Sequence, residues 1–268
     1  MLIDPFSKIL LRDNNGRRII SLMYHSVVDR KSSIKSPWCI SLHQFSQQLD
    51  LLQAYGWTSV CAQQLSRSID KLPKKTVVIT FDDGYANNFK AFEELAKRNM
   101  LASWFVVTND LGKISSWSDA DAAPAKLLVP KQLLEMHAEG MEIGSHTLSH
   151  CRLTQASNDQ IKLELCQSRH YLSELLDHSV ISFAYPYGLY NSEILSAIKS
   201  AGYQVAFTTN SGFGFVNNNP LEVRRIAIMA NDSLSTFARK LVFADNDVSW
   251  EKIFRYGLSR IKSRIGLS

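Results

Sequence analysis

The chain has 268 residues, 45% of them hydrophobic and 21% charged, so it can bury a full core, and we expect a single α/β domain. The formal net charge of +5 is modest, and the absence of a basic block with interleaved aromatic residues argues against nucleic-acid binding. The sequence has neither a long apolar run that predicts a membrane span nor a basic leader followed by an apolar core.

Apolar, strand-like runs alternate with helical segments from residue 18 onward. Residues 18–24 predict a buried strand that delivers His25 at its carboxyl end. A helix is expected to begin after Ser41, its N-cap, and to end just before Gly56. Further strands are predicted at residues 57–60, 76–81, 102–107, 141–144, 180–184, 203–208 and 223–228. Further helices are predicted at residues 62–69, 85–99, 131–139, 158–176, 192–200 and 233–243.

Two connecting segments have signals of their own. Ser157 and Gln160 form a capping-box pattern that opens the longest predicted helix. Residues 109–130 are irregular, and we expect them to form a loop at the rim of the site. The alternation of strands and helices, with polar residues after the strands, predicts a parallel (β/α) barrel of the TIM type.

The strand at residues 76–81 closes with Asp82 and Asp83, followed by Gly84. Successive side chains of a strand point to opposite faces, so both carboxylates reach one site only where the strand ends and the backbone turns, which Gly84 permits. Two close carboxylates repel each other unless a cation keeps both ionised. The pair therefore indicates a metal site.

His146 and His150 follow another short strand-like run and lie four residues apart. That spacing puts both imidazoles on one side of a helical turn or tight loop. One carboxylate and two histidines leave coordination positions open, which is typical of a catalytic zinc site, and the second carboxylate is then free to act as a base. Taken alone, each feature is more often an ordinary turn or a structural histidine. Their joint placement at strand ends favours the metal site.

Three motifs carry a resemblance to a known family. Residues 80–84 read Thr-Phe-Asp-Asp-Gly, residues 146–150 read His-Thr-Leu-Ser-His, and residues 185–188 read Tyr-Pro-Tyr-Gly. In these motifs the chain resembles the polysaccharide deacetylases of carbohydrate esterase family 4. It is most similar to the branch that includes the poly-N-acetylglucosamine deacetylases, and the resemblance extends over most of the chain.

The resemblance implies a distorted barrel of about seven strands. It also implies a metal-dependent deacetylase that removes the N-acetyl group from an amino sugar of a polysaccharide, an oligosaccharide or a lipid-linked glycan. In this reading Asp83, His146 and His150 bind the metal, with zinc expected first and cobalt, nickel or manganese as alternatives. Asp82 is then the general base, and the backbone N–H of Tyr187 stabilises the oxyanion.

The chain departs from the family pattern at two places. Ala184 stands where the third motif has arginine; Arg225 is a candidate replacement, and a solvated arginine at a strand start is the alternative. No histidine follows His178, so the late histidine that supplies a general acid in relatives is absent. We expect His25 to be the general acid because it ends a strand. The alternative is a histidine that caps this strand through a backbone hydrogen bond.

Other functions stay open beside N-deacetylation. Deformylation or hydrolysis of another small amide would use the same residues. A catalytically reduced glycan-binding protein would bind metal and sugar without releasing acetate, whereas a two-histidine, one-carboxylate iron oxygenase would have no use for Asp82. Eight aromatic residues are candidate platforms for sugar rings, with core packing as the alternative for each: Tyr24, Tyr85, Trp104, Trp117, Tyr185, Tyr190, Phe213 and Phe215.

Residues 248–268 predict a basic amphipathic helix after a barrel domain at residues 1–247. This segment has five basic residues and one acidic residue. It either packs on the barrel as part of the same domain or lies on an anionic membrane surface. The four cysteines show no paired spacing, so we read them as free thiols of a reducing compartment. We therefore expect a cytoplasmic protein, or one peripheral to the inner face of the membrane, with its oligomeric state open.

Overall fold

The computed structural model describes residues 3–12, 16–29, 36–67, 69–117 and 124–255. Its central element is a curled parallel sheet in the order β10-β1-β5-β6-β7-β8-β9, and every neighbouring pair in this order is parallel. The short strand β4 (Thr58–Ser59) pairs with the first half of β5, and β6 pairs with the last two residues of β5. The seven strands of the main order are β1 (Arg18–Tyr24), β5 (Lys75–Phe81), β6 (Ser103–Val106), β7 (Glu142–Ser145), β8 (Ser182–Ala184), β9 (Val205–Phe207) and β10 (Ile226–Ala227).

A parallel bridge between Phe207 and Val223 brings the two ends of the sheet together. Val223 lies three residues before β10, so this contact curls the sheet into a distorted barrel. The prediction of a distorted parallel barrel with seven strands is confirmed. The carboxyl ends of the strands therefore converge at one face, which is where sites form in this architecture.

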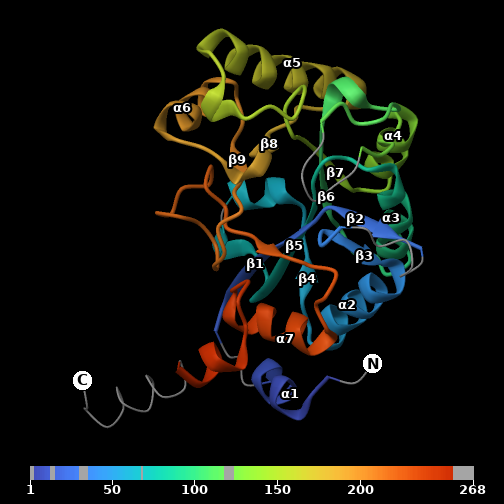
Figure 1. Cartoon of the computed structure of the whole chain (residues 1–268), viewed down its shortest axis with the longest axis vertical. Coiled ribbons are helices and arrows are strands. Elements are labelled where there is room, and N and C mark those ends of the chain that lie inside the picture. Colours follow the sequence, from blue (N-terminus) through green and yellow to red (C-terminus); the bar gives the residue numbers. More distant parts are fainter. Residues whose placement is uncertain (1–2, 13–15, 30–35, 68, 118–123, 256–268) are drawn as a thin grey trace.

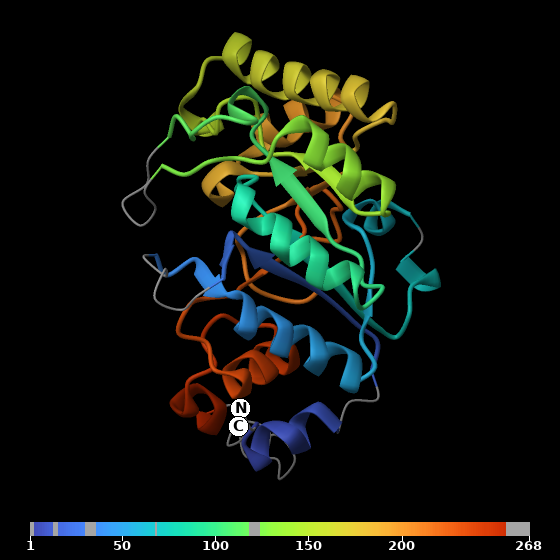
Figure 2. The same cartoon turned by 90° about the vertical axis from the view of Figure 1, so that its right-hand side faces the viewer.

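Helices cover the outside of the curled sheet (Figure 1, Figure 2). The side chain of Ser41 accepts from the N–H of Gln44 at 3.2 Å, which confirms the predicted N-cap of the first barrel helix. The covering helices are α2 (Leu42–Ala54), α3 (Phe89–Ala96), α4 (Pro130–Ala138), α5 (Asn158–Leu176), α6 (Ser192–Ser200) and α7 (Leu234–Phe243).

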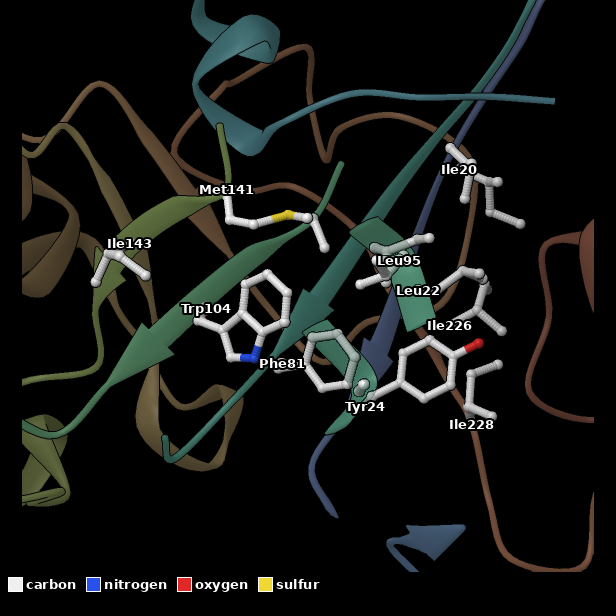
Figure 3. Packing of buried hydrophobic residues seen from close by; sticks show 14 of the residues in the cluster. Ile20, Leu22, Tyr24, Phe81, Leu95, Trp104, Met141, Ile143, Ile226 and Ile228 are labelled. Carbon is white, nitrogen blue, oxygen red and sulfur yellow. The ribbon is translucent and has the colours of Figure 1, made fainter. Parts of the chain in front are cut away.

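Apolar side chains are buried on both faces of the strands. In β5, Phe81 belongs to the layer between sheet and helices, whereas Val78 belongs to the layer inside the barrel. This alternation follows from the period of two along a strand. The ring of Phe81 stacks on that of Trp104 with centroids 4.8 Å apart, and Figure 3 shows Tyr24 beside them. The stack lies under the carboxyl ends of three neighbouring strands and supports the turn that follows β5.

Several predicted elements differ in the structure. The helix expected at residues 62–69 is a 3-10 turn, Ala62–Ser66. The helix expected at residues 85–99 is divided into a 3-10 turn, Ala86–Asn88, and α3. The division has a physical cause, because the side chain of Asn88 leaves the helix to bond the backbone N–H of Val27 and the carbonyl of His25. The capping box of α5 is half formed, since Ser157 caps the N–H of Gln160 while the Gln160 side chain donates to Glu164.

One α-helix and two strands among the described residues were not predicted. Helix α1 (Pro5–Arg12) packs against α7. The strands β2 (Ser26–Val28) and β3 (Cys39–Ser41) form a parallel pair beside the carboxyl end of β1. All three are too short for periodicity to distinguish them from loops.

The predicted C-terminal helix lies mostly outside the described residues, although residues 250–255 are helical. The ring of Trp250 lies 5.3 Å from that of Phe6 in α1, and Ile253 is buried. The division of the chain at residue 247 stays a prediction. Within the described ranges, none of the helices has the length and apolar character that crossing a bilayer requires.

Candidate metal centre

The turn after β5 places the two aspartates. Asp82 continues the β1–β5 pairing through a bond from its N–H to the carbonyl of Tyr24, at 3.0 Å. Asp83 and Gly84 then adopt positive φ values of 72° and 81°. A Cβ at Gly84 would lie 3.0 Å from the Val106 side chain, so glycine permits both the turn and the close approach of β6. This reversal presents both carboxylates at the barrel face.

The loop after β7 places the two histidines. The N–H of His146 donates to the carbonyl of Val106 at 2.9 Å, which extends the β6–β7 pairing by one residue. Thr147 and His150 have positive φ values of 69° and 61°. The Thr147 hydroxyl accepts the N–H of His150 at 2.9 Å and closes a tight turn. The predicted tight loop, with both imidazoles on one side, is therefore present.

A glutamate that the sequence reasoning missed anchors this loop. Glu164 in α5 accepts the N–H groups of Leu148 and Ser149, each at 2.9 Å, and the Ser149 hydroxyl at 2.6 Å. It is almost fully buried. Glu164 falls on the buried side of an amphipathic helix. A charged residue at such an apolar position is the sequence signal that could have indicated its structural role.

Asp83, His146 and His150 converge on one point. Asp83 Oδ1 lies 3.5 Å from His146 Nε2 and 3.3 Å from His150 Nε2, and the three ligand atoms lie within 4.8 Å of one another. Tetrahedral ligands at about 2.0–2.2 Å from a zinc ion are separated by about 3.3–3.6 Å, so the observed spacing fits a metal. In the described part of the chain this is the one such cluster of three.

Protonation states also fit a metal site. His146 Nδ1 lies 2.8 Å from the carbonyl oxygen of Ala184. A carbonyl only accepts, so Nδ1 carries the proton and Nε2 is free to act as a ligand. Burial acts to raise the pKa of Asp83, but the neighbouring imidazoles of His146 and His150 outweigh it and hold the pKa well below its ordinary value. The aspartate is therefore an anion at neutral pH.

Asp82 forms a buried ion pair with Arg225. Arg225 Nη1 donates to Asp82 Oδ1 at 2.6 Å, and the two side chains are 0% and 4% exposed. Arg225 Nε also donates to the carbonyl of Thr208 at 2.9 Å, which fixes the guanidinium. Burial acts to raise the pKa of Asp82, but the charge of Arg225 and its hydrogen bond to the carboxylate lower it below its ordinary value. Asp82 is therefore ionised and held in one orientation.

Ala184 occupies the position that carries arginine in the family motif, and it lies two strands away from Arg225. Ala184, at the end of β8, is fully buried among apolar residues and pairs in register with Phe207 of β9. The guanidinium of Arg225 lies 5.8 Å from the centre of the Phe207 ring. The barrel thus brings an arginine to Asp82 from the segment before β10, although β8 lacks one. The alternative reading of Arg225 as a solvated residue is wrong.

His25 lies beside the same face, directly after β1. Burial lowers the pKa of the His25 imidazole. It outweighs the negative charges of Asp83 and Asp82, which act to raise this pKa. The His25 ring packs against Trp38 at 4.8 Å. The side chain of Asn88 donates to the backbone carbonyl of His25. Among the described residues, His25 Nδ1 is buried and has no hydrogen-bond partner, so no backbone cap through this nitrogen is seen within them.

Aromatic rings surround His150. Trp117 stacks on it with centroids 4.7 Å apart at 29°, and Tyr187 lies at 4.7 Å from another direction. Tyr187 has a positive φ of 60°, and its loop depends on Gly188, where a Cβ would meet the Thr209 side chain at 2.0 Å. The guanidinium of Arg152 covers the Tyr187 ring at 3.6 Å. Backbone strain at Asp83, Thr147, His150 and Tyr187 is thus concentrated at the site.

Four of the eight candidate sugar platforms are core residues. Tyr24, Trp104 and Tyr185 are at most 1% exposed, and Tyr85 is also buried. The Tyr24 hydroxyl donates to Gln48 inside the core. These side chains cannot offer a ring face to a sugar, and that part of the prediction is wrong. The other four, Trp117, Tyr190, Phe213 and Phe215, are partly or well exposed.

Fold and site together define the class of protein, a parallel α/β barrel with a candidate catalytic metal centre at the carboxyl ends of its strands. Comparison with known proteins gives the family. The polysaccharide deacetylase family model matches residues 69–206, and the chain belongs to this family. Members of this family are metal-dependent deacetylases, and three site residues, Asp83, His146 and His150, lie within the matched range.

Individual relatives agree over most of the chain. The poly-beta-1,6-N-acetyl-D-glucosamine N-deacetylase of Staphylococcus aureus is 26% identical over 249 residues, which cover 84% of this chain and 82% of the relative. The solved structure of the Streptococcus pyogenes deacetylase PplD in complex with acetate is 29% identical, with a TM-score of 0.73, and covers 85% of this chain and 99% of that one. IcaB from Ammonifex degensii is 26% identical, with a TM-score of 0.69, and covers 85% and 97%.

Proposed function

We propose that this protein is a metal-dependent N-deacetylase that hydrolyses the N-acetyl group of an amino sugar within a glycan. The observation that carries the proposal is the pairing of two differently held aspartates. Asp83 faces two imidazole nitrogens at 3.3 and 3.5 Å, whereas Asp82 faces a guanidinium at 2.6 Å. One carboxylate is thus placed to bind a metal and the other to accept a proton.

Asp83, His146 and His150 would hold the metal, and zinc is the ion that we propose. This donor set of two neutral imidazoles and one carboxylate, with further positions open, is that of catalytic zinc sites. A divalent ion bound there would lower the pKa of a bound water molecule to about 7 and polarise the acetyl oxygen. Cobalt, nickel or manganese are alternatives for the same donor set.

The residues around the metal ligands would perform the remaining tasks. Asp82, ionised and oriented by Arg225, takes the proton from the attacking water. The backbone N–H of Tyr187, in the strained turn beside His150, donates to the oxygen on which negative charge develops. His25 protonates the leaving amine, since an amine is expelled poorly unless it is protonated. Arg225 touches Asp82, so its role is positioning.

The relatives and the surroundings of the site support the proposed substrate class. The Staphylococcus aureus relative is named for poly-beta-1,6-N-acetyl-D-glucosamine, which supports an N-acetylated glycan here. The partly exposed ring of Trp117 lies beside His150, where it can pack against a sugar. An oligosaccharide, a polysaccharide or a lipid-linked glycan satisfies these features. The non-catalytic, glycan-binding alternative was suggested by Ala184, which stands where the family motif has arginine. Arg225 contacts Asp82 in its place, which supports the catalytic function over that alternative.

The four cysteines are free, and Cys39 and Cys61 are buried. Free thiols support the proposal that the protein works in a reducing compartment such as the cytoplasm.

The test is acetate release from N-acetylated oligosaccharides after metal removal and reloading with zinc or cobalt. The wild-type protein is expected to lose activity with chelator and regain it with metal. Asp83→Ala is expected to lose both metal and activity, whereas Asp82→Asn keeps the metal and loses turnover. Equal metal loss in both variants, or an Asp82→Asn variant with the normal rate, would show that the two roles are wrongly assigned. Metal-loaded wild-type protein that releases no acetate from any N-acetylated glycan would overturn the proposed function itself.

A further inference from the structure

Exposed apolar side chains gather at one end of the molecule, where α1 and residues 250–255 lie together (Figure 1). Among the described residues, ten large apolar side chains are exposed, and four of them belong to these two segments. Ile9 and Phe254 are the most exposed of the ten, at 63% and 68%. We call this surface the terminal patch; its members are Phe6, Ile9, Trp250 and Phe254.

The rings of the terminal patch contact one another. Trp250 lies 5.3 Å from Phe6 and 6.5 Å from Phe254, measured between ring centroids. The row therefore joins residues that are more than 240 positions apart in the sequence. Contiguous exposed apolar surface of this kind marks an interaction site more often than isolated exposed residues do.

The patch rests on a fixed base. Leu11 of α1 and Ile253 are buried under it. Arg239 of α7 places its guanidinium 4.9 Å from the Trp250 ring and also bonds Asp4 Oδ2 at 3.1 Å. These contacts hold the exposed rings against the barrel, so the ordering cost of presenting them to a partner is small.

Basic side chains border the patch. α1 contributes Lys8 and Arg12, and its neighbour Asp4 is already bonded to Arg239. Lys252 and Arg255 are exposed. Their partners, Asp245 and Glu251, form ion pairs with them at the surface, where such pairs are weak. The following sequence, residues 256–268, has three more basic residues and no acidic one. Apolar rings bordered by cations are the pattern of segments that lie in the interface of an anionic bilayer.

We propose that the terminal patch docks this protein on an anionic membrane surface. The four side chains would insert among the lipid headgroups while the surrounding cations contact lipid phosphates. A second copy of the chain fits less well, because a stable protein interface uses about 20–30 residues from each side and four side chains are far fewer. Because the residues come from both helical segments, docking would fix the orientation of the barrel relative to the bilayer.

The experiment is vesicle flotation with the metal-loaded full chain. Vesicles contain either phosphatidylcholine alone or phosphatidylcholine with phosphatidylglycerol. The patch variant is Phe6→Ser, Trp250→Ser and Phe254→Ser together. The matched control is Leu163→Ser with Tyr171→Ser, because these side chains are each 40% exposed on α5, at the opposite end of the molecule (Figure 2). The control thus removes exposed apolar side chains elsewhere on the surface, and circular dichroism with thermal melting establishes that both variants are folded.

We expect the wild-type chain and the control to float with anionic vesicles and to be released by high salt, since headgroup attraction is screened. Binding of the patch variant is expected to fall at least about tenfold, a loss of about 1.4 kcal/mol. Absence of wild-type binding to anionic vesicles would overturn the proposal, as would equal losses in the two variants. A wild-type dimer that the patch variant abolishes, without any flotation, would assign the patch to self-association instead. The assay needs no turnover, so its outcome is independent of the proposed deacetylase activity.

Discussion

Replacing Arg225 with methionine tests how the site keeps its general base ionised. The substitution preserves much of the side-chain length and removes the charge that lies 2.6 Å from Asp82 in a fully buried position. At an effective dielectric constant of about 20, opposite charges about 4 Å apart attract by about 4 kcal/mol. Breaking a buried pair by removing one partner typically costs about 3–5 kcal/mol, because the other charge stays buried. We expect a loss of this size in the metal-free protein, measured by urea unfolding.

The double variant Asp82→Asn with Arg225→Met separates charge from packing. It removes both charges, so it is expected to recover most of the stability that Arg225→Met loses. If the double variant is as unstable as the single one, the loss comes from packing and the ion-pair explanation fails. Metal-free protein is used because a bound cation would itself stabilise the Asp82 carboxylate.

Kinetics give a readout that a purely structural role would not change. Arg225 lowers the pKa of Asp82, so its removal is expected to raise that pKa. A base must be deprotonated to act, so the acidic limb of the pH profile of kcat/KM is expected to move to higher pH. Arg225→Lys keeps the charge without the planar fork and should restore part of the shift. If the acidic limb of the kcat/KM profile does not move in Arg225→Met, the positioning role of Arg225 is refuted.

Three further outcomes follow from other contacts. His25→Ala is expected to lower amide turnover by about 10²- to 10⁴-fold and to affect a nitrophenyl acetate far less, since that leaving group needs no proton; equal losses would indicate a structural role. Trp117→Ala removes the ring stacked on His150 and should weaken metal affinity by about 10- to 100-fold, measured by competition with a chromophoric chelator; unchanged affinity would contradict this. Burial raises the pKa of Glu142, so the stability that its neutral form provides is lost as pH rises through the raised pKa. Glu142→Gln stays neutral and should therefore be more stable than the wild-type chain in alkaline buffer but not in acidic buffer. Parallel pH–stability curves would show that Glu142 does not titrate as described.

The barrel and the metal ligands could be predicted because their signals are local. Asp82, Asp83 and Gly84 specify a strand end and a turn within three residues, and the spacing of His146 and His150 specifies one loop. The contact of Arg225 with Asp82 depends on the closure of the barrel over 143 positions of sequence. From the sequence, Arg225 could be either the replacement for the family arginine or a solvated residue. The sequence could not decide between these, because no local pattern determines which strands become neighbours.

The aromatic residues show where sequence reasoning fails. Trp104 and Tyr24 lie on strands that are buried on both faces, so alternation does not reveal which side chains reach the site. Trp117 lies in an irregular segment for which periodicity gives no information, yet it contacts His150. Glu164 was missed because a lone glutamate on a helix usually faces solvent, whereas this one is nearly buried and bonds two backbone N–H groups of the histidine loop.

The position of β5 in the sheet has a consequence for anyone who divides this chain. The family match covers residues 69–206, yet β5 lies between β1 and β6, and β1 lies beside β10; β1 and β10 are both outside that range. An expression fragment cut at those limits would turn the strand that carries the two aspartates into an unprotected, apolar edge strand, which invites aggregation. It would also leave Asp82 without its arginine. The smallest unit expected to fold alone therefore extends from β1 through α7, because Lys240 of α7 bonds the carbonyl of Ala227 in β10.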